Sequence, residues 1–133
     1  TLNSVHASIV DKAHQCSAKY PEGVSEFEAT GLTPEYLDEW PVPVVKESAL
    51  RYALQLVEIV PIRHNDTFLV IGSIEHVWVR DDLVGADGFL HLQKAEVVAS
   101  TGLDAYYLPK FLARFAYARP DELPGKISGQ DEE

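Results

Sequence analysis

The sequence is poor in residues that several functions require. Its 133 residues include no methionine, a single cysteine and eleven basic residues against twenty-one acidic ones, which gives a formal net charge of −10. A lone cysteine cannot form a disulfide within the chain, as is typical of proteins from reducing compartments. The acidic balance argues against nucleic acid and anionic membrane surfaces as partners, because both attract clustered Lys and Arg.

Long apolar runs and targeting signals are also missing. No run approaches the roughly 18 apolar residues that indicate a membrane-spanning helix, and no signal peptide is recognisable. We therefore expect a cytoplasmic protein without membrane contact. A chain that begins at Thr1 and contains no methionine does not begin at a natural start codon, so we expect it to be part of a longer protein.

Short catalytic motifs are absent as well: there is no GxSxG, no GxGxxG and no phosphate-binding loop, so no catalytic residue can be assigned. His6 and His14 are eight residues apart on one predicted helix, too far apart to share a metal ion. No metal site is expected. Cys16 falls on the apolar face of that helix, and we interpret it as a small buried hydrophobic residue.

The strongest pattern in the sequence is that of two β-strands. Residues 49–62 and 67–79 alternate apolar and polar side chains, and the polar residues 64–66 between them predict a turn and hence a hairpin. Gly72 indicates a bulge or a barrel corner within the second strand. The apolar face of this hairpin is expected to be among the most buried parts of the protein, at Leu54, Leu56, Val70 and Ile74.

The remaining predicted elements are helices and short segments outside the hairpin. Apolar residues at helical spacing predict a helix over residues 3–18, and a second short helix is expected from the Ser25 cap to Gly31. The proline-rich segment 33–48 is expected to be an edge strand or a surface connection. Residues 92–98 are predicted to form a short helix, and residues 110–117 a helix or a strand. The fold class is thus mainly β with peripheral helices (β or α+β).

Two aromatic features have competing interpretations. Tyr106 and Tyr107 follow Gly102 in an irregular segment, where paired rings can belong to a core, an interface or a platform for a planar ligand. His76 lies within the second predicted strand, and we favour a packed or hydrogen-bonded histidine over one that contacts a ligand.

Several segments, in order, resemble the flavin reductase-like family. The most specific is SAKYPEGVSEFEATGLT at residues 17–33, and weaker matches are VVKES at 44–48, LVIGSIEHVWVRDD at 69–82, GLDAYY at 102–107 and YARP at 117–120. The resemblance covers about residues 3–120. The chain is therefore identified as similar to the C-terminal part of such a protein: residues 1–120 belong to an incomplete domain whose N-terminal half is missing, and residues 121–133 form a flexible acidic tail.

The resemblance implies an FMN-binding split β-barrel that works as a homodimer and passes electrons from NAD(P)H, through bound flavin, to flavin or another acceptor. It also implies that most contacts to the FMN phosphate belong to the missing half. Among the residues present, it places Tyr106 and Tyr107 near the isoalloxazine ring and lets Glu26 and Phe27 shape the ring pocket. Trp78 and the GLDAYY segment depart from the usual family pattern and leave the substrate open.

Two other functions remain compatible with the sequence. One is a flavin-binding relative without reductase activity, such as an electron carrier. The other is a non-enzymatic, β-rich interaction domain whose resemblance to the family is structural only. Flavin absorption would distinguish the two flavin-binding proteins from the interaction domain. Oxidation of NAD(P)H would then distinguish the reductase from the electron carrier.

Overall fold

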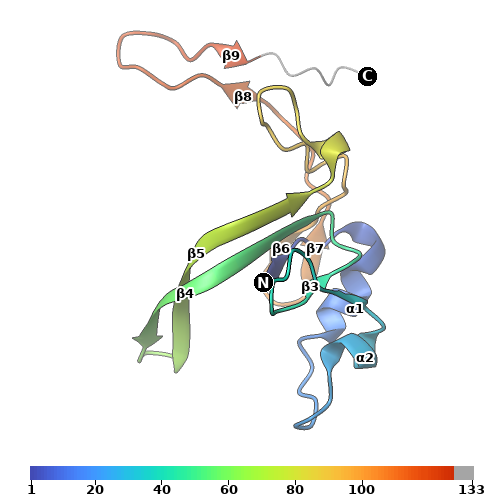
Figure 1. Cartoon of the computed structure of the whole chain (residues 1–133). Helices are drawn as coiled ribbons and strands as arrows, with labels where there is room; N and C mark the ends of the chain where they lie inside the picture. The colour runs from blue at the N-terminus through green and yellow to red at the C-terminus, as the bar shows by residue number, and fades with distance from the viewer. Residues whose placement is uncertain (128–133) are drawn as a thin grey trace.

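A long antiparallel hairpin runs through the middle of the protein, whose computed structural model describes residues 1–127 (Figure 1). Strands β4 (Leu50–Ile62) and β5 (Thr67–Val79) pair along their full length, and residues 63–66 form the turn between them. Strand β1 (Leu2–Asn3) pairs antiparallel with the base of β4, which gives a three-stranded sheet of order β1-β4-β5. The predicted hairpin is confirmed.

Two bulges interrupt the β4–β5 ladder. Leu56 pairs with Gly72 and Glu58 with Ile71, so Val57 is an extra residue in β4 at the position that Gly72 indicated. Nearer the base, Glu75 is the extra residue, this time in β5. Each bulge adds twist and bends the ladder locally.

Short elements accompany the hairpin. The N-terminal half contains the 3-10 helix η1 (Ala7–Ile9), helices α1 (Val10–Gln15) and α2 (Glu26–Thr30), and the paired strands β2 (Pro34–Glu35) and β3 (Val44–Val45). After β5 come the 3-10 helix η2 (Asp81–Leu83) and two small antiparallel pairs, β6 (Ala99–Thr101) with β7 (Ala105–Tyr107), and β8 (Arg114–Phe115) with β9 (Lys126–Ile127). The mainly β prediction is confirmed.

The predicted helices differ in how well they match the structure. The expected helix over residues 3–18 is wrong at its start, because Asn3 is held in β1 and its side-chain oxygen accepts the Val45 N–H at 2.9 Å. Helix α2 begins after Ser25 and ends at Gly31, as predicted, and Gly31 has the left-handed φ of +68° that suits a helix end. The proline-rich segment supplies two two-residue strands, β2 and β3, joined by a loop.

The later part of the chain shows that the helix predicted over residues 92–98 is wrong, and that residues 110–117 contain a strand and not a helix. Residues 92–96 form turns instead of a helix, because the backbone there bonds to the N-terminal segment: Ala7 donates to the Glu96 carbonyl at 3.1 Å and Val98 donates to Val5 at 2.9 Å. Within residues 110–117 only the two-residue strand β8 is regular. Of the predicted tail, Lys126 and Ile127 pair with β8, and residues 128–133 lie outside the described part of the chain.

The hydrophobic core lies at the base of the hairpin. Ala49, Leu83 and Ala95 form its buried cluster, with Val79 and Val97 packed against it. Leu83 is fully buried, and η2 places it there directly after β5. The core therefore joins the hairpin base to the segment that follows it.

The expectation that the hairpin face is deeply buried is wrong for this chain. Leu54 is half-buried, whereas Leu56, Val70 and Ile74 are 54%, 63% and 59% exposed. Figure 1 shows why: the outer half of the hairpin extends away from the helices and the small sheets. The alternation of the sequence identified an apolar face, but among residues 1–127 no other segment covers it there.

Leu83→Ala is expected to lower the free energy of unfolding by about 2–5 kcal/mol, because it leaves a cavity beside Ala49 and Ala95. Leu112→Ala is the matched control: Leu112 is 93% exposed, and its truncation is expected to cost less than about 0.5 kcal/mol. Urea unfolding followed by circular dichroism measures both. Equal losses in the two variants would contradict the placement of the core.

Candidate functional site

Two segments of the family resemblance meet through the carboxylate of Glu47. It accepts hydrogen bonds from the Thr33 N–H at 3.1 Å and from the Thr33 hydroxyl at 2.8 Å. On the backbone side of the same residue, the His6 Nε2 lies 2.6 Å from the Glu47 carbonyl oxygen. The motif residues Thr33 and Glu47 therefore tie the end of α2 and the N-terminal segment to the entry of β4.

The electrostatics of Glu47 follow from these contacts. Partial burial raises the pKa of its carboxyl, but the hydrogen bonds from the Thr33 side chain and backbone, with a smaller contribution from the Lys12 charge, outweigh burial. The net pKa lies below the ordinary value. Glu47 is therefore a structural anion: it is ionised at neutral pH like any exposed glutamate, and its lowered pKa keeps it ionised further into acid.

An aromatic cluster occupies the face of β5 beside the loop after β2. The His76 ring stacks on Trp78 at 5.5 Å between centroids, and Trp40 meets His76 edge-on at 5.3 Å. The Trp78 indole N–H donates to Asp38 at 2.5 Å. His76 thus packs against two tryptophan rings although its side chain is exposed, and the choice between a packed and a ligand-contacting histidine stays a prediction. Asp38 and Glu39 both have positive φ, 48° and 60°, and the Trp40 N–H donates to the Leu37 carbonyl at 2.8 Å, as in a type I′ turn.

The four predicted flavin-contacting residues are distributed around α1. The Tyr106 hydroxyl, on β7, lies 2.9 Å from His14 Nδ1, and the two rings meet edge-on at 5.7 Å between centroids. Tyr107 follows on β7 with 60% of its surface exposed. Glu26 and Phe27 begin α2, which packs against α1. The structure thus brings Tyr106 to α1, while Glu26 and Phe27 lie on the neighbouring helix.

Cys16, at the end of α1, differs from its prediction. It is half-buried and its thiol donates to the Lys12 carbonyl at 3.4 Å. The interpretation as a small buried hydrophobic residue is therefore wrong, because the core forms at the base of the hairpin and α1 buries no residue completely.

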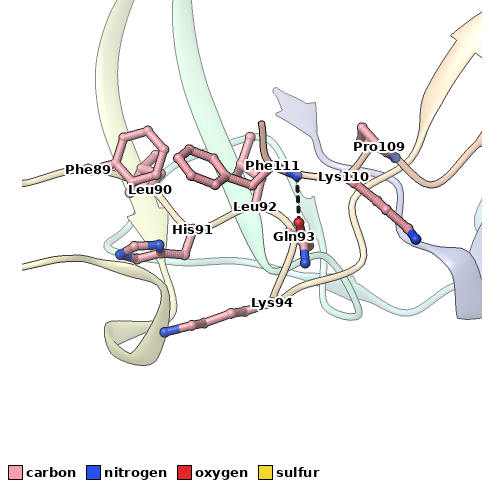
Figure 2. Close-up of a pocket in the computed structure, with 9 residues that line it drawn as sticks. All are labelled: Phe89, Leu90, His91, Leu92, Gln93, Lys94, Pro109, Lys110 and Phe111. Atoms are coloured by element: carbon pink, nitrogen blue, oxygen red, sulfur yellow. Dashed lines mark hydrogen bonds between the residues drawn. The ribbon is translucent and has the colours of Figure 1, made fainter. Parts of the chain in front are cut away.

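A cavity of about 470 Å³ lies between two segments after β5, residues 89–94 and 109–111 (Figure 2). The Phe89 and Phe111 rings meet edge-on at 6.1 Å, and the guanidinium of Arg114 lies 4.1 Å from the centre of the Phe89 ring. In Figure 2 the Gln93 amide lies between two lysines whose ammonium groups point in opposite directions, that of Lys94 to the lower left and that of Lys110 to the right. None of the four predicted contact residues lines this cavity.

The two walls of the cavity are held differently. Residues 89–94 follow Leu83 of the core and are fixed by backbone hydrogen bonds, from Gly85 to Phe89 and from His91 to Leu83, both at 2.8 Å. A Cβ at Gly85 would lie 3.0 Å from the His91 ring, so a larger residue would push this wall outward. The opposite wall is tied across the cavity by the Phe111 N–H, which donates to Gln93 Oε1 at 2.6 Å.

Two arginines form ion pairs with carboxylates in the segment that follows β5. Arg114 bonds Asp87 at 2.7 Å and Arg80 bonds Asp82 at 2.7 Å. The hydrogen bond from Arg114 is the main reason why the pKa of Asp87 is lowered, and the one from Arg80 has the same effect on Asp82. Sequence reasoning missed this cavity. The only signal was the cluster of Lys110, Arg114 and Arg119 in an otherwise acidic chain.

Residues 1–127 contain no group of three or more His, Cys, Asp or Glu side chains placed to hold a metal ion. None of their helices is both long enough and apolar enough to cross a membrane.

Comparison with known proteins adds a family and a set of similar structures. Residues 1–97 match the family described as "Flavin reductase like domain". An uncharacterized protein of Aquifex aeolicus (strain VF5) is 26% identical over 110 residues, which cover 83% of this chain and 55% of that protein.

Among solved structures, a putative flavin reductase with split barrel domain from Shewanella frigidimarina NCIMB 400 is 52% identical, with a TM-score of 0.83 over 87% of this chain and 59% of the other. Nitrilotriacetate monooxygenase component B from Bacillus cereus is 24% identical, with a TM-score of 0.70 over 83% and 57%, and is alike in fold alone. The predicted split-barrel fold is confirmed by these likenesses, although the sheets of residues 1–127 do not close. The chain spans less than two thirds of the length of these relatives.

Glu47→Gln is expected to lower the free energy of unfolding at pH 7 by about 0.5–1.5 kcal/mol, because the hydrogen bonds from Thr33 lose their charged acceptor. The folded pKa is lowered, so the stabilisation is present above the unfolded pKa of about 4.3 and disappears as the pH falls through the folded value. The difference in free energy of unfolding between the wild type and Glu47→Gln should therefore become smaller in acid. Denaturant titrations from pH 7 to about pH 3 measure it, and Glu58→Gln on the exposed part of β4 is the control for loss of one negative charge.

Proposed function

The chain belongs to the flavin reductase-like family, and from that membership we propose that it is part of an FMN-binding oxidoreductase of flavin reductase type. The protein would pass electrons from NAD(P)H, through bound flavin, to flavin or another acceptor. The observation that carries this proposal is the family match over residues 1–97. The 52% identity to a putative flavin reductase supports it.

The residues present fit the ring of a flavin better than its phosphate. Tyr107 exposes a large aromatic surface on β7, and the Tyr106 hydroxyl is already oriented by His14. An exposed aromatic ring held in one orientation can stack on a planar isoalloxazine. The chain carries eleven basic residues against twenty-one acidic ones, so we propose that the phosphate is bound elsewhere in the protein.

The flavin supplies the redox chemistry, and the protein positions it. We propose that Tyr106 and Tyr107 contact the ring, and that Glu26 and Phe27 border its pocket from the start of α2. Because α2 is tied to β3 and β4 through Thr33 and Glu47, the pocket edge would be fixed to the central sheet. Acid–base groups are not required for hydride transfer itself, which suits a site without a catalytic triad.

We also propose a homodimer and a cytoplasmic location. The apolar residues exposed on the outer hairpin, Leu56, Val70 and Ile74 among them, support association, since a surface of this kind is typical of an interface. A two-fold dimer would cover the same surface in both copies. Sedimentation that finds only monomers at micromolar concentration would contradict the dimer.

The proposed function has a direct test. The purified full-length protein is expected to show a flavin absorption band after incubation with FMN, and to oxidise NADH or NADPH when excess flavin is present. A protein that binds flavin but oxidises neither nicotinamide would be an electron carrier. A protein that binds no flavin would leave only a β-rich interaction domain.

Tyr107→Ala is expected to weaken FMN binding about two- to tenfold, because one stacking contact contributes about 0.5–1.5 kcal/mol. Tyr106→Phe keeps the ring but loses the contact with His14, so it should reduce affinity less than Tyr106→Ala does. Tyr117→Ala is the control, since Tyr117 is equally aromatic and 91% exposed outside the proposed site. Fluorescence titration with FMN measures all four variants. Unchanged affinity in both alanine variants at 106 and 107 would remove the tyrosines from the site.

A further inference from the structure

His14 is placed to control the proton of the Tyr106 hydroxyl. Its Nδ1 lies 2.9 Å from the hydroxyl oxygen, and the two rings meet edge-on at 5.7 Å between centroids. The first residue lies on α1 and the second on β7, so the contact joins two elements that are far apart in the sequence. Two contacts between the same two side chains hold the phenol in a fixed orientation relative to the imidazole.

The direction of this hydrogen bond depends on the charge of the imidazole. When the Tyr106 hydroxyl donates to an unprotonated Nδ1, the proton of the neutral ring is fixed on Nε2. A protonated imidazole carries a hydrogen on both nitrogens, so Nδ1 donates and the hydroxyl accepts. In the neutral state only lone pairs of the Tyr106 oxygen remain for a ligand, whereas in the charged state its hydrogen is released for a ligand.

The surroundings of His14 leave this pair as its direct interaction. An imidazole ordinarily changes its charge between about pH 5 and 8, a range in which a phenol keeps its proton. Other ionisable groups lie on the elements around it: Asp11 and Lys12 on α1, Glu26 and Glu28 on α2, and Tyr107 on β7, while η1 has none. The Lys12 ammonium donates to the Gly31 carbonyl at 2.9 Å. Within residues 1–127, the hydrogen bond that His14 makes is the one to Tyr106.

We propose that His14 is a positioning residue, which switches the Tyr106 hydroxyl between acceptor and donor toward the ring of the flavin. The inference rests on the proposed function for the identity of this ligand. The polar edge of an isoalloxazine presents carbonyl oxygens and unprotonated ring nitrogens against a single N–H, so a donor has more partners there than an acceptor has. Protonation of His14 should therefore strengthen the contact between Tyr106 and the flavin.

The test is a fluorescence titration of the full-length protein with FMN at about pH 5.5, 6.5 and 8. The phosphate of FMN also changes its charge in this range, so each affinity is divided by that of Tyr106→Phe at the same pH. This variant keeps the ring and lacks the hydroxyl. The ratio is expected to be about three- to tenfold higher at pH 5.5 than at pH 8, since it reports one hydrogen bond.

Two further variants assign the effect to His14. His14→Gln can accept from Tyr106 through its amide oxygen but cannot change its charge, so its ratio should stay constant over the three pH values. His64→Gln is the matched control, because it removes an exposed histidine from the turn between β4 and β5 and should keep the wild-type dependence. Thermal unfolding of each variant at each pH verifies that it is folded.

A second measurement needs no flavin. Nitrogen-15 NMR of the histidine rings in the full-length protein is expected to place the proton of neutral His14 on Nε2 at pH 8, and Tyr106→Phe should remove this preference. A proton on Nδ1 in the wild type would overturn the switch.

The flavin titration can contradict the inference in three ways. The ratio can be independent of pH, it can be higher at pH 8 than at pH 5.5, or its dependence on pH can persist in His14→Gln. Failure of the proposed function is recognised separately, because then FMN does not bind at any pH. In that case the NMR measurement alone decides whether His14 sets the direction of the Tyr106 hydrogen bond.

Discussion

The antiparallel pairing of β4 with β5 is the interaction on which the rest of the structure depends. Its base carries the core, where Val79 of β5 meets the buried Leu83 cluster, and the segments before and after it are attached there. Asn3 and Ser4 bond to Val45 and Leu50 on one side, and the loop that forms the cavity wall leaves β5 on the other. Local helices of five and six residues could not persist without this attachment.

The elements that could be predicted from sequence were those with local signals. Alternation over thirteen residues in each strand fixed the hairpin, and the Ser25 and Gly31 pair fixed the limits of α2. The predictions that failed depended on distant partners. Residues 92–98 do not form the predicted helix because their backbone bonds to Val5 and Ala7. The periodicity of the segment itself carries no information about such distant partners. Likewise, alternation shows which face of a strand is apolar but not whether anything covers it.

The candidate site was predictable to a lesser degree. The resemblance to a family selected Tyr106 and Glu26 as flavin contacts. The structure adds the hydrogen bond between the Tyr106 hydroxyl and His14 Nδ1, which joins residues 92 positions apart and has no signal in the sequence. The cavity was missed because its two walls, residues 89–94 and 109–111, are brought together only by the fold. The ion pair between Asp87 and Arg114 joins the same part of the chain across 27 positions and likewise has no local signal.

The two bulges of the hairpin have a consequence for how its length can change. Val57 is the extra residue in β4 and Glu75 the extra residue in β5, so the offsets cancel and the paired positions on both sides of the bulged region keep the same register. A bulge accommodates an extra residue without changing the pairs beyond it, so loss of Val57 or of Glu75 would close the bulge and leave the outer pairs in place. The two bulges are therefore the points at which either strand of the hairpin can change its length by one residue while the faces of the outer side chains stay as they are.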